Sequence, residues 1–279
     1  MTETETQSQQ QGELQKKLWA IANDLRGNMD ASEFRNYILG LIFFRFLSDR
    51  VLNYVNELLE NDDETFEEIY ADPDAQSELR DDVTKTLGFF IEPDKLFSHL
   101  IELIQAGNFD TEKLQTAINS VQNSTIGESS EADFKGLFED MDLSSTRLGN
   151  SVAKRSELIA KVMLNLNDIP FSNEEMEIDV LGDAYEYLIG QFAASAGKKA
   201  GEFYTPQQVS KLLSRLVTLD RDEVQKVYDP AMGSGSLLLR VGDYTKVAEY
   251  YGQELNRTTY NLARMNMLMH GVSYDRFDM

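Results

Sequence analysis

Residues 228–236, which read YDPAMGSGS, constrain the fold more than any other part of this chain. The apolar pair Val227 and Tyr228 leads into the segment, and the run Leu237–Leu239 continues out of it in a helical pattern. This order predicts a strand, a tight glycine turn and a helix, which is how a nucleotide-type site opens in an α/β sheet.

Length and composition set the outer limits. A chain of 279 residues should form roughly two domains, because ~100–200 residues is a common domain size. It contains no cysteine, which excludes disulfides and thiolate metal sites and fits a reducing cytoplasm. The apolar run over residues 37–47 contains Arg45 and falls short of the ~18 residues of a membrane span. Residues 1–12 are polar, lack the blocks of a signal peptide and are expected to form a disordered tail.

The charge is strongly negative and unevenly placed. The formal net charge is −22, and residues 57–82 hold twelve acids against the single base Arg80. Residues 198–279, by contrast, are nearly neutral. A chain this acidic should not bind DNA unaided, because binding depends on cations that neutralise phosphates. We interpret the acidic run as a solvated helix face or loop. The alternatives are a docking surface for a basic partner and a region that must stay off DNA.

The first half of the chain predicts helices, and strand signals are scarce before residue 225. Leu14, Leu18 and Leu25 recur at helical spacing, and a capping box at 30–33 is expected to open a long helix. Glu92-Pro93 predicts a further helix with the proline in its first turn. Other helices are expected over residues 111–122, 150–166 and 176–195, with a domain boundary near residues 167–173.

The pattern changes after residue 200. Thr205 is expected to cap a helix that begins at Pro206, and the unit at 225–242 follows. Residues 247–251 predict a second strand, residues 256–270 a helix, and residues 274–278 the start of a third strand. This β-α-β-α alternation is typical of a parallel, doubly wound sheet.

Three features in this part of the chain predict chemistry. The dinucleotide fingerprint requires a third small residue where Leu238 stands, and Asp229 suits a ligand with a positive group better than a pyrophosphate. Glu254, at the end of the next strand, can accept hydrogen bonds from two ribose hydroxyls. Thr205, at a positive helix end, can bind a carboxylate. Each feature has an ordinary structural explanation, but together they describe an amino acid joined to a nucleoside, S-adenosylmethionine.

The motifs also resemble those of a known family. Residues 201–206 (GEFYTP), 229–236 and 252–256 (GQELN) are similar to three successive motifs of amino-group DNA methyltransferases. Residues 18–27, 141–149 (MDLSSTRLG) and 179–189 (DVLGDAYEYLI) resemble the modification subunit of type I restriction-modification systems. The resemblance covers essentially the whole chain.

The resemblance implies N6-adenine methylation of DNA with S-adenosylmethionine as cofactor. It implies an N-terminal helical domain (13–170), then the first part of a Rossmann-like α/β methyltransferase domain (171–279) with an incomplete doubly wound sheet. The implied partners are DNA, a specificity subunit, a second modification subunit and a restriction subunit, with no membrane. The implied cofactor-binding residues are Glu202, Phe203, Tyr204, Thr205, Pro206, Gln207, Asp229, Ser234, Gly235, Ser236 and Glu254.

One family motif has no counterpart. The family grips the flipped adenine with an Asn-Pro-Pro-aromatic motif, whereas none of the five prolines here are adjacent. We therefore expect a C-terminally truncated methyltransferase that is inactive alone and contains no catalytic residue.

Two other functions stay open. The first is a non-catalytic assembly protein with a remnant methyltransferase fold. The second is an NAD-dependent oxidoreductase, which Leu238 and the Thr205-Pro206 pair disfavour. No metal site is expected, because neither His99 nor His270 has ligand spacing around it.

Overall fold

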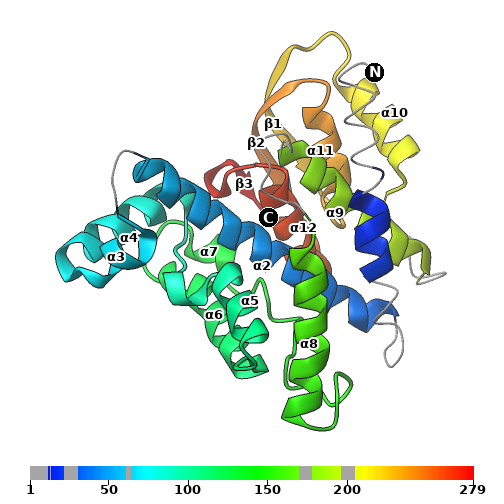
Figure 1. The fold of residues 1–279 in the computed structure, drawn as a ribbon. Coiled ribbons are helices and arrows are strands. Elements are labelled where there is room, and N and C mark those ends of the chain that lie inside the picture. Colours follow the sequence, from blue (N-terminus) through cyan, green and yellow to red (C-terminus); the bar gives the residue numbers. More distant parts are fainter. Residues whose placement is uncertain (1–11, 13, 22–30, 61–63, 170–177, 196–204) are drawn as a thin grey trace, which may run out of the picture. The chain divides into compact units, whose positions relative to one another are not determined.

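The structure is a computed structural model that describes residues 12, 14–21, 31–60, 64–169, 178–195 and 205–279. These residues fall into two compact units, the first with residues 12, 14–21, 31–35, 178–195 and 205–279 and the second with residues 36–60 and 64–169. The described residues are mostly helical, with one small sheet (Figure 1). Residues 1–11 of the expected tail and the expected boundary at 170/171 lie outside the described residues, so both stay predictions.

The second unit is entirely helical within its described residues. Its main element is α2 (Ala31–Leu58), which supplies residues 36–58 and buries an apolar stripe that includes Ile38, Ile42 and Val51. The long helix predicted after residue 30 is therefore confirmed, while the capping residue Asp30 lies outside the described residues. The remaining helices are α3 (Phe66–Ala71), α4 (Pro73–Leu87), η1 (Pro93–Lys95), α5 (Phe97–Gln105), α6 (Thr111–Ser124), α7 (Glu131–Phe134) and α8 (Val152–Asn167).

The acidic run forms the solvated helix surface that its composition predicted. Every described acid between residues 57 and 82 has an exposed side chain. Two of these acids also cap helices. Thr65 and Glu68 form a reciprocal capping box at the start of α3, and Asp72 accepts a hydrogen bond from the Asp74 amide at the start of α4.

The helix predicted from Glu92 is wrong in its first turn. Residues Pro93–Lys95 form a separate 3-10 turn, and Leu96 is extended, with φ −61° and ψ 152°. The α-helix begins only at Phe97, whose backbone N–H donates to the buried Ser48 hydroxyl at 2.6 Å. A side chain of α2, Ser48, therefore binds the first N–H of α5, and the sequence around Pro93 does not show this contact.

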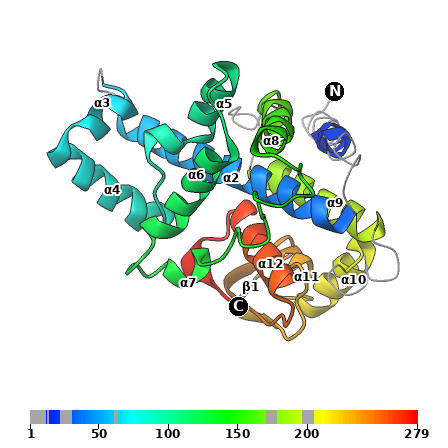
Figure 2. The same ribbon diagram turned by 90° about the horizontal axis from the view of Figure 1, so that it is seen from below.

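The first unit contains a three-stranded parallel sheet in the order β1-β2-β3 (Figure 1). Helix α11 (Ser236–Gly242) lies beside β1 (Figure 2). β1 (Glu223–Asp229) pairs with β2 (Lys246–Gly252) so that Asp229 lies opposite Gly252. The predicted parallel sheet is confirmed. The third strand is shorter than predicted, because Tyr274–Arg276 form a 3-10 turn and β3 contains only Phe277–Asp278.

Four helices accompany the sheet: α9 (Ile178–Ser195), α10 (Gln207–Val217), α11 (Ser236–Gly242) and α12 (Arg257–Met269). α11 packs on β1 and β2, α10 packs beside α11, and α12 contacts both α9 and α11 (Figure 1). Trp19, from the helix over residues 14–21, lies edge-on against Phe192 of α9 with ring centroids 5.5 Å apart.

Helix α10 presents its polar side to its neighbour and its apolar side outward. Ser210 and Ser214 are fully buried, whereas Leu212 and Leu216 are 60% and 61% exposed. The small serines let α10 approach α11 closely. Strand β1, at one edge of the sheet, likewise exposes Tyr228.

Candidate functional site

The glycine loop, residues 230–235, joins the end of β1 to the start of α11. Gly233 and Gly235 have φ values of 59° and 79°, in the left-handed region that L side chains rarely adopt. Gly235 is also tightly packed, since an added Cβ would lie 3.3 Å from Met267 Cε of α12. The two glycines are therefore required by backbone conformation, and the second also by the approach of a helix.

Backbone hydrogen bonds attach the glycine loop to the end of the neighbouring strand. The Gln253 N–H donates to Asp229 O and the Met232 N–H donates to Gln253 O, each at 3.0 Å. The Asp229 carboxylate accepts from the Ala231 N–H at 2.9 Å through one oxygen. Asp229 therefore shapes the loop itself, and this structural role comes in addition to the predicted contact with an ammonium group.

Glu254 lies two residues after Gly252, the last residue of β2, and lines the same cavity as Pro230 and Ala231 of the glycine loop. Its Oε1 accepts from the Asn256 N–H at 2.7 Å, and Asn256 in turn caps α12 by accepting from the Thr259 N–H at 3.0 Å. These contacts hold Glu254 at the mouth of a cavity of about 500 Å³. The lining residues are Pro230, Ala231, Gln253, Glu254, Leu255, Tyr260 and Met279.

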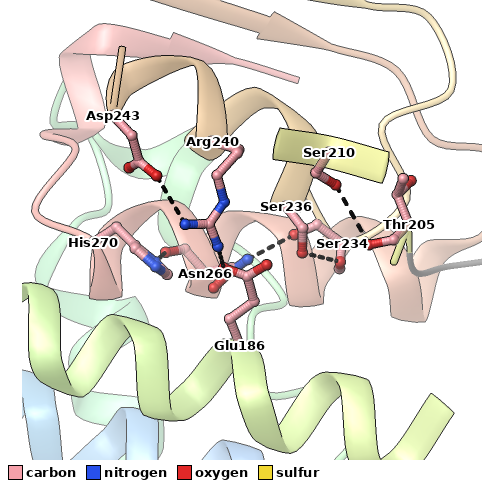
Figure 3. Close-up of polar contacts among 9 residues, drawn as sticks. All are labelled: Glu186, Thr205, Ser210, Ser234, Ser236, Arg240, Asp243, Asn266 and His270. Carbon is pink, nitrogen blue, oxygen red and sulfur yellow. Dashed lines mark hydrogen bonds and ion pairs between the residues drawn. The ribbon is translucent and has the colours of Figure 1, made fainter. Parts of the chain in front are cut away.

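The Thr205-Pro206 pair lies at the start of α10, but one residue off its predicted place. The helix begins at Gln207 with Pro206 as its N-cap, and no side chain caps it. The Thr205 carbonyl accepts from the Ser210 hydroxyl at 3.5 Å (Figure 3). The prediction that Thr205 caps the helix is wrong, because Pro206 itself takes the extended conformation of the cap, with ψ 137°.

A group of buried polar side chains lies beneath the glycine loop (Figure 3). Glu186 of α9 pairs with Arg240 of α11 at 3.1 Å, and Arg240 also pairs with the more exposed Asp243 at 2.8 Å. Asn266 of α12 donates from Nδ2 to the Ser234 carbonyl at 3.0 Å. The Ser234 and Ser236 hydroxyls lie 2.9 Å apart.

Burial dominates the electrostatics of this group. It raises the pKa of the Glu186 carboxyl, and the positive charge of Arg240 offsets only part of that rise. Burial acts to lower the pKa of Arg240, but Glu186 and Asp243 outweigh it, so the net direction is upward. The Glu186–Arg240 ion pair is therefore largely shielded from water.

Asp183, Glu186 and His270 could offer ligand atoms to a metal ion, since these atoms lie within 4.8 Å of one another. His270 has no ligand spacing along the chain, and only the packing of α12 against α9 brings it near the two acids. His270 Nδ1 already lies 2.9 Å from the Asn266 carbonyl, and Arg240 supplies a positive charge to Glu186. The absence of a metal stays a prediction.

The fold brings together some of the predicted cofactor residues. Asp229 and Glu254 flank the ends of adjacent strands, but of the two only Glu254 lines the cavity, which Asp229 adjoins through Pro230. Ser234, Gly235 and Ser236 are buried and do not line the cavity. Thr205 and Pro206 precede α10, Gln207 is its first residue, and all three are also absent from the lining. Glu202, Phe203 and Tyr204 lie outside the described residues. The assignment of all these residues to cofactor binding remains a prediction.

Sequence reasoning missed several residues of the site. Tyr260 lines the cavity and donates from its hydroxyl to the Met279 carbonyl at 2.9 Å. The sequence could have identified Tyr260, because residues four apart lie on the same side of a helix and Tyr260 is four residues after the Asn256 cap of α12. Glu186 and Asn266 carried no signal of this kind, because their partners are 54 and 32 residues away.

Family models match both parts of the chain. One described as the HsdM N-terminal domain matches residues 14–166, and one described as N-6 DNA Methylase matches residues 176–279. Within the described residues, no helix combines the length and apolar character needed to cross a membrane.

Individual relatives agree with these models. The chain is 39% identical to the type I restriction enzyme MpnII methylase subunit of Mycoplasma pneumoniae, over 97% of its own length and 52% of the relative's. It is 26% identical to the MjaIX methylase subunit of Methanocaldococcus jannaschii, over 94% and 46%. A crystal structure of a type I restriction-modification methyltransferase subunit from Streptococcus thermophilus matches with a TM-score of 0.86 and 39% identity, covering 96% of this chain and 57% of that one. The chain thus spans about half the length of the curated relatives it matches.

Proposed function

The chain belongs to the family of type I restriction-modification methyltransferase subunits, and from that premise we propose that its first unit binds S-adenosylmethionine for N6-adenine methylation of DNA. The observation that carries the proposal is the cavity of about 500 Å³ between the glycine loop and Glu254. Ligand pockets of roughly 300–1,000 Å³ hold molecules of this size. In α/β folds such ligands bind at the carboxyl ends of parallel strands, where this cavity lies.

The residues at the cavity fit the chemistry of this cofactor. Glu254 uses one oxygen to shape the turn, and its carboxylate can accept hydrogen bonds from both ribose hydroxyls. Leu255 and Tyr260 supply an apolar wall and an aromatic face for a base. Asp229, at the end of β1, is assigned to the ammonium group, and Thr205 to the carboxylate.

Within the proposed reaction, the bound cofactor supplies a methyl group on a positively charged sulfur. This chain's own residues bind and orient it: Glu254 fixes the ribose, and Asp229 fixes the amino-acid end. Correct orientation alone can supply a large part of the rate enhancement. We found no adjacent prolines in the sequence, so we propose that these 279 residues bind cofactor but do not transfer the methyl group to DNA.

The partners follow from the family and from the charge. We propose a specificity subunit that recognises the DNA sequence, a second modification subunit and a restriction subunit in a cytoplasmic complex. The net charge of −22 supports delegation of DNA contact to a partner, because 48 acids outnumber the 26 lysines and arginines that could neutralise phosphates.

Calorimetric titration with S-adenosylmethionine tests the proposal. Glu254→Gln and Asp229→Asn keep the size of each side chain but remove its charge. A hydrogen bond to a charged group contributes ~1.5–3 kcal/mol, so we expect the dissociation constant to rise about 10–100-fold in each variant. Glu249→Gln is the matched control, because Glu249 lies in β2, the strand that leads to Glu254, and does not line the cavity.

Two outcomes would contradict the proposal. Equal affinity in all four proteins would remove Asp229 and Glu254 from the cofactor site. No binding by a folded wild-type chain at millimolar cofactor would refute the proposed function and favour the alternative, a non-catalytic assembly protein with a remnant methyltransferase fold.

A further inference from the structure

Three polar side chains from three helices meet beneath the glycine loop, and the proposed cofactor contacts do not use them. They are Glu186 of α9, Arg240 of α11 and Asn266 of α12 (Figure 3). Glu186 and Asn266 are buried, and the Arg240 side chain is 11% exposed. Burying polar groups is unfavourable unless a structural or functional gain compensates for it. Each member therefore calls for an explanation.

Asn266 holds the glycine loop directly. Its side chain is fully buried, and its Nδ2 donates to the Ser234 carbonyl at 3.0 Å. Since a carbonyl only accepts, this contact also determines which way the amide points. Oδ1 is then buried without a hydrogen-bond partner among the described residues. The amide is thus oriented for one task, which is to fix the peptide between Ser234 and Gly235.

Glu186 holds the helix that follows the loop. It is only 1% exposed, and its Oε2 lies 3.1 Å from the Arg240 guanidinium, one turn along α11 from Ser236. Its Oε1 is buried and makes no hydrogen bond of normal geometry with a described residue, and the nearby Ser236 hydroxyl offsets only part of the effect of burial on the pKa of the carboxyl. In Figure 3 the side chain reaches from α9 toward Arg240, with Ser236 and Ser234 beside it. An incompletely paired buried carboxylate is a poor source of stability, because desolvation opposes the attraction of the pair.

We propose that Glu186 and Asn266 are positioning residues for the cofactor site, acting through Arg240 and the Ser234 carbonyl to hold the glycine loop and the first turn of α11 in the binding conformation. This inference rests on the proposed function and extends it to two residues that do not line the cavity. It also assigns a role to residues 179–189, the α9 motif, which contains Glu186 but supplies no residue to the cavity lining.

The test compares Glu186→Gln and Asn266→Leu with wild type. Both substitutions keep the approximate side-chain size while removing the ion pair or the hydrogen bond to Ser234. Asp243→Asn is the matched control, because Asp243 pairs with the same arginine but has a side chain that is 48% exposed. Hydrogen exchange of the amides at 233–239 in the free protein measures how well the glycine loop and the first turn of α11 are ordered. Calorimetry measures the affinity for S-adenosylmethionine.

We expect faster exchange at 233–239 in both variants and not in the control. If the binding conformation falls to about a tenth of the population, the dissociation constant should rise about tenfold. Exchange and affinity should both return toward the wild-type values in Glu186→Asp, which keeps the charge. A purely structural role would lower the melting temperature while leaving cofactor affinity unchanged well below that temperature.

The possible failures are distinguishable. Unchanged exchange at 233–239, or faster exchange with unchanged affinity, would overturn the positioning role while the wild type still binds cofactor. An effect of the same size in Asp243→Asn would also overturn it, since that result would assign the effect to Arg240 at the surface. If wild type fails to bind, the proposed function fails, and the inference that rests on it fails as well.

Discussion

The contact between Gly182 and His270 offers a sharp test of the packing that brings Glu186 to the glycine loop. Gly182 lies in α9, one helical turn before Glu186, and α9 packs against α12 at this point. A Cβ added at Gly182 would lie 2.8 Å from His270 Cδ2 and 2.9 Å from Cγ. That separation is about 0.7 Å short of the optimum for carbon atoms, so Gly182→Ala must move the ring or the helix.

The expected magnitude combines two opposing effects. Overpacking of a well-packed contact lowers stability by about 1–3 kcal/mol. Alanine in a helix interior is favoured over glycine by roughly 0.5–1 kcal/mol. We therefore expect Gly182→Ala to lower the free energy of unfolding by about 1 kcal/mol, within a range of roughly 0–2.5 kcal/mol. Urea denaturation followed by Trp19 fluorescence measures this, because Trp19 is the only tryptophan and contacts α9 through Phe192.

A double-mutant cycle isolates the contact. His270→Ala removes the ring, so Gly182→Ala in that background should stabilise the chain by roughly 0.5–1 kcal/mol through helix propensity alone. The sign of the alanine effect should thus reverse between the two backgrounds. If Gly182→Ala is stabilising by the same amount in both, α9 and α12 do not approach as closely as described, and the reasoning is refuted.

Three further predictions concern other parts of the chain. Burial raises the pKa of Glu186 in the folded state above 4.5, its ordinary value. Above pH 4.5 the unfolded chain therefore loses the Glu186 proton while the folded state still holds it. Stability should therefore fall as pH rises from 4.5 through the raised pKa, and Glu186→Gln should remove that slope in urea titrations at several pH values; parallel slopes would contradict this. Ser210→Leu should lower the free energy of unfolding by about 1–3 kcal/mol, because Ser210 is fully buried against α11. Leu212→Gln, at a 60% exposed position, should change it by less than about 0.5 kcal/mol. Similar effects of the two substitutions would contradict the described orientation of α10. Thr65→Ala should lower the stability of the helical unit by about 1 kcal/mol through loss of the α3 cap, measured by circular dichroism in urea, and no change would argue against the capping box.

Much of the local structure could be predicted from short-range patterns. The glycine loop, the parallel strands on either side of it and the helix after Asn256 follow from residue types within a few positions of each other. The Thr205 cap failed for a local reason, the conformation of Pro206, whereas the start of α5 failed because a distant partner decides it. The Ser48 hydroxyl caps Phe97 from another helix, so α5 begins later than Pro93 suggested.

Residue patterns along the chain were enough to identify the family, to place the glycine turn and to put Asp229 and Glu254 at the ends of neighbouring strands, because these features depend on backbone conformation and on motif order. Which side of α10 faces inward follows from packing instead, since serines rather than leucines allow the close approach to α11. Packing also decided that Glu186 and Asn266 lie beneath the glycine loop. Their partners are far away in the chain, and only the packing of three helices brings the buried charges and amide together.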